Sequence, residues 1–434
     1  MYEESKEARG MTYTGLETYV QQAAFDQTLT RLYGAEGAEK AHSRCMEVME
    51  EFYKIFDRSA EALFSAPGRT EIGGNHTDHQ KGCVLAASVD LDILAAVAPT
   101  QSGIIRVLSQ GYPMIEVDLR ELDPKEEEIN TSAALIRGVA SCMSAMGCDL
   151  RQRGLDVYMT STVPKGSGLS SSAAYEVLMG TMLNELFWEG RCTAVELAQI
   201  GQYAENVFFG KPCGLMDQMA SSIGNLVHID FANPECPYVE KIDFDMEKYG
   251  YRLCITDTKG SHADLTDEYA AIPKEMKLVA KYFGKEVLRD ISINDVLDNI
   301  TDLRKKLGDR CVLRTLHFIY ENKRVQKEVS ALKAGNIGAF LDDVKASGNS
   351  SFKYLQNVYS NQDIKNQNVS LALFVSEMFL GQNGVCRVHG GGFAGTIQAF
   401  VKNGYVENYK YEMDKIFGKD SCKDLRIRKY GGIK

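Results

Sequence analysis

The stretch DVYMTSTVPKGSGLSSSAAYEVLMGTMLNEL, residues 156–186, places a strand, a glycine- and serine-rich turn and a helix in direct succession. Residues 156–163 alternate as a strand does, and the residues after the turn have the three- and four-residue spacing of a helix. The helical stripe consists of Ala174, Val177, Leu178, Met182 and Leu186. We therefore expect an α/β protein in which this turn joins a strand end to a helix start.

The turn itself predicts a phosphate-binding loop. Gly166, Gly168 and the run Ser170–Ser172 lie at the junction. Glycines let backbone N–H groups converge, and the positive dipole of a helix start favours an anion such as phosphate. A serine hydroxyl there can also reach a magnesium ion. An ordinary serine N-cap after a flexible turn is the alternative, but it accounts for one serine and not for three.

A second motif, SAPGRTEIGGNHTDHQKGCVL at residues 65–85, concentrates ionisable side chains. We expect a short loop that carries Arg69, Glu71, His76, Asp78 and His79. A polar surface turn between two strands is the alternative interpretation. The HTDH sequence has no third ligand at a useful spacing, which argues against a zinc site.

The third motif is VCRVHGGGFAGTIQAFV, residues 385–401. Gly390, Gly392 and Gly395 satisfy the GxGxxG pattern of dinucleotide sites, but residues 396–401 alternate like a strand where that pattern demands a helix. Four glycines in six residues instead indicate a loop pressed against a ligand or a neighbouring loop. The chain contains neither a GxxxxGK[ST] sequence nor the HRD and DFG pair, so another kinase architecture is required.

A helix between the second and third glycine-rich segments is predicted by a capping box at Thr193 and Glu196. Gly210 and Pro212 end it, so this helix carries Glu205. Asp217 follows in what we expect to be a short loop. Its apolar neighbours predict partial burial, and a partly buried carboxylate is either paired with a cation or held for chemistry.

The length of 434 residues indicates two domains, and the cluster near residues 233–245 is the best border because nothing periodic crosses it. We place one lobe at 1–237 and the other at 238–434. A helical stretch over 268–345 and a final strand in RIRKY, residues 426–430, are expected.

A net charge of −10 without a basic stripe argues against nucleic acid or an anionic membrane as a partner. Eleven cysteines without a CxxC pair indicate neither a disulfide framework nor a zinc site. The N-terminus lacks the features of a signal peptide, and no apolar run is long enough to span a bilayer. We expect a soluble cytoplasmic protein, monomeric or weakly oligomeric.

In this order and spacing, the three motifs resemble the signature of the small-molecule kinase superfamily of galactokinase, homoserine kinase, mevalonate kinase and phosphomevalonate kinase. The resemblance is closest to the galactokinase family: SAPGRTEIGGNHTDH resembles its sugar-binding signature, PKGSGLSSSAAYEV its phosphate loop and CGLMDQMAS its catalytic-aspartate segment. HADLTDEYA, LRDIS, ENKRV and HGGGFAG extend the resemblance over about Phe64 to Val401. It implies a two-lobed fold with the active site between the N- and C-terminal lobes.

The same resemblance implies an ATP-dependent kinase that phosphorylates galactose at the C1 hydroxyl, giving galactose 1-phosphate and ADP. Asp217 would be the catalytic base, steadied by Arg69. The ATP phosphates would lie against Pro164, Gly166, Ser167, Gly168, Leu169, Ser170, Ser171 and Ser172, with Gly391 and Gly392 bracing that loop. Mg²⁺ would be held by Glu205 and a serine of the run, Ser171. The sugar would be bound by Glu71, Asn75, His76, Asp78, Gly214 and Tyr269.

Two positions depart from the family signature, which reads Asn where this chain has Glu71 and Glu where it has Asn75. The family's glutamate contacts the C6 hydroxyl, so we expect Asn75 to govern the C6 end of the sugar. The paired basic residues that usually follow the family's tyrosine are absent after Tyr269. A related sugar 1-kinase, acting on galacturonate, arabinose or an N-acetylated sugar, is therefore an alternative. A non-catalytic sensor of sugar and ATP is another, which the intact serine run and Asp217 disfavour.

Overall fold

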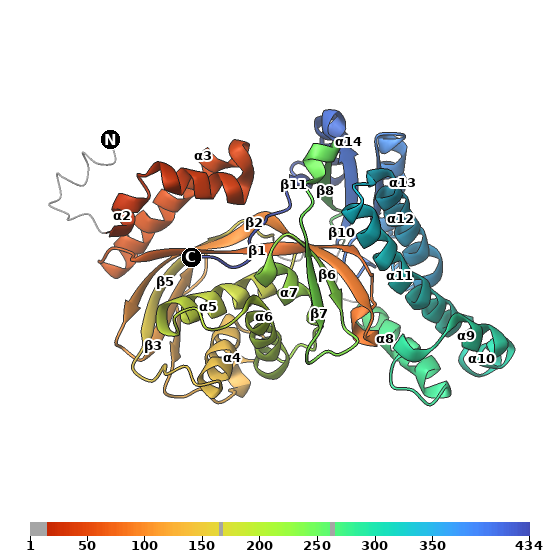
Figure 1. Cartoon of the computed structure of the whole chain (residues 1–434), viewed down its shortest axis with the longest axis horizontal. Helices are drawn as coiled ribbons and strands as arrows, with labels where there is room; N and C mark the ends of the chain where they lie inside the picture. The colour runs from red at the N-terminus through yellow and green to blue at the C-terminus, as the bar shows by residue number, and fades with distance from the viewer. Residues whose placement is uncertain (1–14, 165–167, 261–264) are drawn as a thin grey trace.

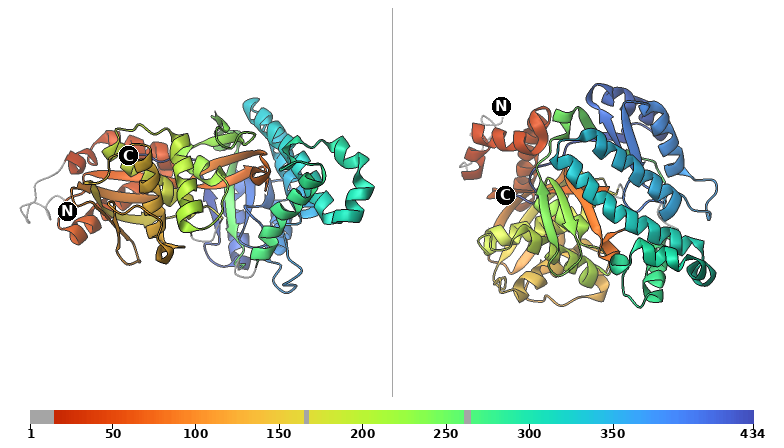
Figure 2. Two further views of the ribbon diagram at one scale, coloured as in Figure 1. Left: turned by 90° about the horizontal axis from the view of Figure 1, so that it is seen from below. Right: turned by 45° about the vertical axis from the view of Figure 1, so that its right-hand side comes forward.

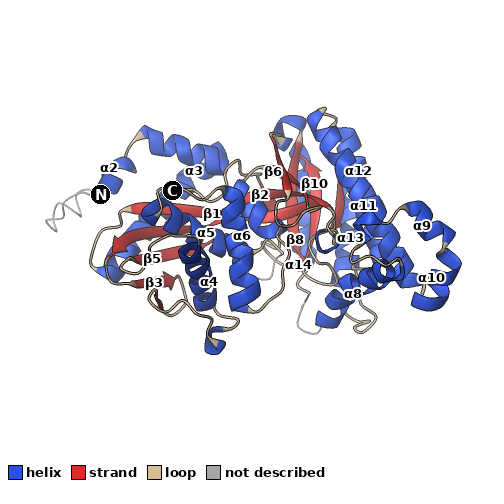
Figure 3. Ribbon diagram, turned by 60° about the horizontal axis from the view of Figure 1, so that its bottom comes forward, coloured by secondary structure: helices blue, strands red, loops and turns tan. Residues whose placement is uncertain are grey.

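The computed structural model describes residues 15–164, 168–260 and 265–434, which form two sheets with helices packed on them (Figure 1). Gly166 and Ser167 of the predicted phosphate loop lie outside the described residues. Figure 2 shows the same arrangement from two further directions, and Figure 3 separates its helices from its strands by colour. None of the described helices has the length and apolarity that crossing a bilayer requires.

The larger sheet has seven strands in the order β4-β3-β5-β2-β6-β7, with β1 antiparallel to β2. Its strands are β1 (Ala62–Gly73), β2 (Cys83–Thr100), β3 (Ile104–Ser109), β4 (Ile115–Asp118), β5 (Gly154–Ser161), β6 (Leu226–Asp230) and β7 (Tyr238–Ile242). The long strand β2 is its centre, because it pairs with β1 along its length, with β6 near its start and with β5 near its end. Helices cover both faces of a strand placed in this way, which explains its continuous apolar run.

Helices α4 (Ser132–Ala145), α5 (Ser171–Phe187), α6 (Ala194–Tyr203) and α7 (Met216–Ile223) lie on one face of this sheet, and α2 (Gly15–Tyr19) and α3 (Ala23–Phe56) lie on the other (Figure 1). One buried cluster joins α4 and α5 to the strands, and a second joins α3 to the opposite sides of β2 and β5. The predicted helix after the phosphate loop is confirmed as α5. The capping box of Thr193 and Glu196 is confirmed at the start of α6, and a π-helical turn, Ala204–Phe209, continues that helix through Glu205.

The smaller sheet is antiparallel throughout, in the order β11-β8-β10-β9. Its strands are β8 (Tyr251–Asp257), β9 (Gly384–Val388), β10 (Thr396–Lys402) and β11 (Cys422–Leu425). The predicted helical stretch is confirmed as α8 (Thr266–Tyr282), α9 (Ile293–Asp298), α10 (Ile300–Leu307), α11 (Asp309–Lys333) and α12 (Ile337–Ser350), with α13 (Asn368–Leu380) and α14 (Val406–Phe417) completing this part. A buried cluster of β1, β2, β8, α11 and α12 side chains joins the two sheets into one core.

The chain continues the larger sheet beyond the border predicted at residue 237, because β7 pairs with β6. The division of the chain into domains stays a prediction. The strand predicted at residues 426–430 is wrong. The smaller sheet ends at Leu425, and the following residues return to the larger sheet, where single bridges join Ile427 to Val89 and Ile433 to Ser65.

Two further local predictions are wrong. Residues 65–85 are not a short loop, because β1 extends to Gly73 and β2 begins at Cys83. Every residue of β1 is buried, so this strand lacks the polar alternation that identifies a half-exposed strand. Asp217 is likewise not in a loop but in the first turn of α7, where a carboxylate is stabilised by the free N–H groups of the helix start.

Candidate active site

Arg69 of β1 and Asp217 of α7 form a bidentate ion pair. The Nε and Nη2 atoms of Arg69 donate to Oδ1 and Oδ2 of Asp217, each at 2.6 Å. Ser170 Oγ donates to the same Oδ2 at 2.7 Å. Burial alone would raise the pKa of Asp217, but the Arg69 guanidinium and the Ser170 hydroxyl hold it below its ordinary value. The side chain remains 28% exposed, so an ionised carboxylate is available to a ligand.

Strand β1 holds this pair against the segment predicted to bind phosphate. The backbone N–H of Arg69 donates to the carbonyl of Leu169 at 3.0 Å, and Arg69 Nη1 donates to the carbonyl of Gly168. A side chain at Gly68 would lie 2.9 Å from the same Leu169 oxygen, so glycine is needed for this approach. Arg69 therefore links the carboxylate of Asp217 to the segment before α5.

A first cavity of about 980 Å³ opens beside this pair. Five of the residues predicted to bind substrate or ATP line it, and so does Arg69; the five are Glu71, His76, Asp78, Gly214 and Gly391. A side chain at Gly214 would lie 2.0 Å from Oδ2 of Asp78, which leaves room for no residue other than glycine. No described residue makes a hydrogen bond to the Asp78 carboxylate, so it is free to accept from a ligand.

His76 presents one ring nitrogen to this cavity. Its backbone has a left-handed φ of 57°, and its Nε2–H donates to the carbonyl of Gly391 at 3.0 Å. Burial lowers its pKa, so the ring is neutral near pH 7 and Nδ1 is an acceptor. Asp78 and His76 together offer acceptors suited to sugar hydroxyl groups.

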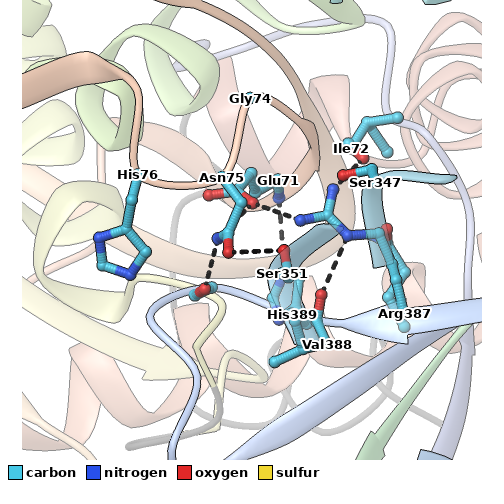
Figure 4. Close-up of polar contacts among 12 residues, drawn as sticks. Glu71, Ile72, Gly74, Asn75, His76, Ser347, Ser351, Arg387, Val388 and His389 are labelled. Carbon is cyan, nitrogen blue, oxygen red and sulfur yellow. Dashed lines mark hydrogen bonds and ion pairs between the residues drawn. The ribbon is translucent and has the colours of Figure 1, made fainter. Parts of the chain in front are cut away.

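Glu71, which lines the first cavity, is hydrogen-bonded to Asn75, which does not (Figure 4). Asn75 Nδ2 donates to Oε1 of Glu71 at 2.9 Å, and Arg387 Nη2 reaches the same oxygen at 2.9 Å. Among the described residues no hydrogen bond reaches Oε2 of Glu71. Burial raises the pKa of Glu71 to about 7, although the positive charges of Arg387 and Arg69 oppose the rise.

Asn75 does not line the first cavity, and its role in binding the sugar stays a prediction. Its side chain is fully buried and saturated with partners: Nδ2 also donates to the carbonyl of Gly390, and Oδ1 accepts from Ser351 at 3.1 Å and Asn357 at 2.9 Å. Figure 4 shows the His76 side chain apart from this network, with no dashed line joining the two. Asn75 joins the sugar-binding motif to the glycine-rich loop.

Tyr269 and Gly392 also lie behind the cavity wall. Tyr269 donates its hydroxyl to the carbonyl of Gly392 at 2.6 Å, and a side chain at Gly391 would lie 2.6 Å from its ring. A side chain at Gly168 would lie 3.2 Å from His389 Nδ1 and from Thr396 Oγ1, and these two residues flank the glycines. The bracing role of Gly391 and Gly392 stays a prediction.

A carboxylate and a hydroxyl suited to a metal ion meet near the start of α5. Ser172 Oγ donates to Oε1 of Glu205 at 3.2 Å, and Lys211 Nζ lies 3.2 Å from the same oxygen. Ser172, and not the predicted Ser171, is therefore the serine beside Glu205. Gln218 donates to Glu205 and also to Glu176, whose pKa is raised well above its ordinary value by burial and by the Glu205 charge.

A second cavity of about 600 Å³ lies on the other side of the α5 start. Ser171 and Ser172 line it together with apolar and aromatic side chains. These include Tyr112, Pro113, Ile115, Leu135, Tyr175 and Phe209. A largely apolar cleft with a few polar groups suits a flat heteroaromatic ring.

Several residues of the site were missed from the sequence. Lys211 and Gln218 contact Glu205. Both lie close to Asp217 in the sequence, and this proximity was the only signal that they belong to the site. Arg387 precedes the glycine-rich loop, and nothing in the sequence links it to Glu71. A row of lysines on and after α8 also lines the first cavity and carried no recognisable motif.

The chain matches two known families. The GHMP kinases N terminal domain matches residues 134–225, and the Galactokinase galactose-binding signature matches residues 50–99. The chain is 31% identical over 382 residues to a galactokinase of Streptomyces coelicolor, covering 88% of this chain and 95% of that protein. It is 30% identical over 363 residues to a galactokinase of Actinobacillus pleuropneumoniae, covering 83% and 90%.

Solved structures agree with the fold. The Lactococcus lactis galactokinase complexed with galactose superimposes with a TM-score of 0.75 at 24% identity, covering 90% of this chain and 99% of that one. The L. major mevalonate kinase in complex with R-mevalonate gives a TM-score of 0.57 at 13% identity, covering 85% of this chain and 97% of that one. The two-lobed small-molecule kinase fold predicted from the sequence is confirmed.

Proposed function

The chain belongs to the galactokinase family and is a sugar kinase with ATP as co-substrate, and we propose that it uses Asp217 to accept the proton of the galactose C1 hydroxyl. The observation that carries this proposal is the contact of Arg69 and Ser170 with one carboxylate. Arg69 lines the first cavity, and Ser170 directly precedes the residues that line the second. Asp217 thus lies where a sugar and a nucleotide would meet.

The sugar would occupy the first cavity. Asp78 and His76 offer acceptors there, and the free Oε2 of Glu71 offers a third, so the wall can hold several hydroxyl groups. In this arrangement Glu71 supplies the carboxylate that the family signature places at the position of Asn75. Asn75 is then a positioning residue, because it acts through Glu71 and the glycine-rich loop.

The nucleoside of ATP would occupy the second cavity, with its phosphates at the start of α5. The free N–H groups and dipole of that helix stabilise the phosphate charge. Arg69 faces the same position, where it can stabilise the transferring phosphoryl group as well as orient Asp217. Phosphoryl transfer of this kind depends mainly on positioning and on charge stabilisation.

Mg²⁺ would be held by Glu205 and Ser172. Mg²⁺ prefers oxygen ligands and is commonly held by one or two protein carboxylates together with substrate phosphates, and this pair provides one carboxylate and one hydroxyl. When bound, the ion neutralises charge on the phosphate oxygens. Lys211 adds a positive charge beside the same carboxylate.

A coupled assay of ADP release tests the proposed function. With ATP and Mg²⁺, galactose should give the release of one ADP for each galactose 1-phosphate formed. Arabinose and N-acetylgalactosamine serve as comparison sugars. ADP release that does not depend on any added sugar, or no release with galactose, would contradict the proposal.

A further inference from the structure

The outer part of the first cavity carries a group of lysines that the proposed reaction does not use. Lys277 and Lys281 are four residues apart on α8 and so share one face, and Lys285 follows the helix. Lys81 ends the short turn Asp78–Gln80, and its backbone carbonyl accepts from Arg289 at 2.9 Å. All four line the same cavity.

None of these four ammonium groups has a carboxylate within 4.0 Å among the described residues, although Glu71, Asp78 and Glu286 line the cavity too. The sequence as a whole has a net charge of −10. A concentration of unpaired positive charge in a cavity of an acidic protein attracts anions.

His79 adds a buried donor to the same wall. Leu288 N–H donates to Oε1 of Gln80 at 3.1 Å, which fixes the amide so that Gln80 Nε2 faces Nδ1 of His79 at 3.4 Å. Nδ1 therefore accepts, and the proton of the neutral ring lies on Nε2. Burial lowers the pKa of His79 to about 4, so the ring is neutral near pH 7. Its Nε2 atom is buried without a partner among the described residues.

The cavity is also larger than one neutral hexose requires. Its volume of about 980 Å³ lies at the upper end of the range of roughly 300–1,000 Å³ found for ligand pockets. A sugar with its C1 hydroxyl at Asp217 leaves space toward α8. The charge, the unpartnered donor and the space point to the same kind of ligand.

We propose that the lysines of α8, with Lys81 and His79, bind an anionic group on an atom remote from C1 of an acidic sugar, which this cavity accepts besides galactose. This inference rests on the proposed function, because it takes the sugar to lie in the first cavity. The anionic group is a carboxylate, as in a uronic acid, or a phosphate ester. A sugar of this class would be held at both ends, by Asp217 at C1 and by the lysines at the far end.

Titration calorimetry with galactose, galacturonate and galactose 6-phosphate tests the inference without requiring turnover. We expect the wild-type protein to bind at least one acidic sugar more tightly than galactose, and the two acids distinguish a carboxylate from a phosphate site. In the variant Lys277→Met/Lys281→Met the affinity for that acid should fall about tenfold, the effect of removing two partly screened charges. Its affinity for galactose should change less than about twofold.

Lys305→Met is the matched control, since Lys305 is an exposed lysine of α10 outside the cavity. It should leave all three affinities unchanged. Raising the salt concentration should weaken the binding of the acid and not that of galactose. Acidic sugars that bind no more tightly than galactose, or equally well to both proteins, would overturn the inference.

A parallel assay of ADP release separates this inference from the proposed function. Normal turnover of galactose together with weak, lysine-independent binding of the acids would overturn the anion site alone. Lysine-dependent binding of an acid without phosphorylation of any sugar would instead overturn the proposed function. Melting curves of the variants confirm that each is folded, because methionine has nearly the helix propensity of lysine.

Discussion

Arg69 Nε and Nη2 lie 2.6 Å from Oδ1 and Oδ2 of Asp217, so the guanidinium faces the carboxylate through both pairs of atoms. A bidentate pair of this kind fixes the orientation of the carboxylate plane and also stabilises the negative charge of the carboxylate. Arg69 also donates to the carbonyl of Gly168, and the same side chain therefore links Asp217 to the segment before α5.

Replacing Arg69 by lysine should keep a positive charge but lose this geometry. We expect Arg69→Lys to reduce kcat by about 10²-fold, the scale of a misplaced catalytic group. Arg69 lowers the pKa of Asp217, so its loss raises that pKa and moves the acid limb of the pH–rate profile to higher pH. Arg151→Lys, an exposed position, is the control. A profile that keeps its acid limb unchanged would show that Arg69 does not tune Asp217.

The serine beside Glu205 can be identified by its effect on magnesium. Ser172→Ala should raise the Mg²⁺ concentration needed for half-maximal activity, because a hydroxyl ligand is lost. Ser171→Ala is the matched control and should change this concentration less. The reverse order of the two effects, measured by Mg²⁺ titration of ADP release, would place the metal at Ser171.

Glu71 should give sugar binding a pH dependence in the neutral range. Its pKa is raised to about 7 by burial, so it becomes an anionic acceptor only as the pH rises through that value. We expect the KM for galactose to fall between about pH 6 and pH 8, and Glu71→Gln to remove this change. The KM for ATP serves as the internal control. An identical inflection in the variant would assign it to another group.

The hydrogen bond between Glu71 and Asn75 predicts that the two positions act together. Asn75→Glu places a second carboxylate beside Glu71 and the carbonyl of Gly390, and should lower the free energy of unfolding by about 2–4 kcal/mol. In Glu71→Asn/Asn75→Glu one carboxylate and one amide are restored. The decrease in the free energy of unfolding of this double variant should be smaller than the sum of the decreases of the two single variants, by at least ~0.5 kcal/mol. Strict additivity in denaturant unfolding would show that the positions are independent.

The local features that the sequence predicted correctly are those with a strong periodic or capping signal. The stripe of α5 and the capping box of Thr193 and Glu196 depend on residues close in the chain, and both are found where expected. Strand β1 was mistaken for a loop because it is buried on both faces and carries its charged side chains inside the protein. From the sequence alone, the charged residues of β1 cannot be distinguished from those of a surface turn, because the residues that pack against them are distant in the chain.

The partners of the site residues could not be predicted, because they come from distant segments. The hydrogen-bonding atoms of the Asn75 side chain are saturated by groups at residues 351, 357 and 390, which are far from it in the sequence. The choice between Ser171 and Ser172 depends on the helix beginning at Ser171, since one residue turns a side chain by about 100°. The hydrophobic pattern of the sequence does not define the first residue of a helix with that precision.

The most direct test of the account is kcat for Asp217→Asn with galactose and ATP. The amide cannot accept the hydroxyl proton, so kcat should fall by about 10²–10⁴-fold, while calorimetry shows both substrates bound with affinities near those of the wild-type protein. Asp298→Asn, an exposed position at the end of α9, should leave kcat unchanged. A variant of Asp217 that is folded, binds both substrates and turns over at nearly the wild-type rate would contradict the assignment of Asp217 as the base.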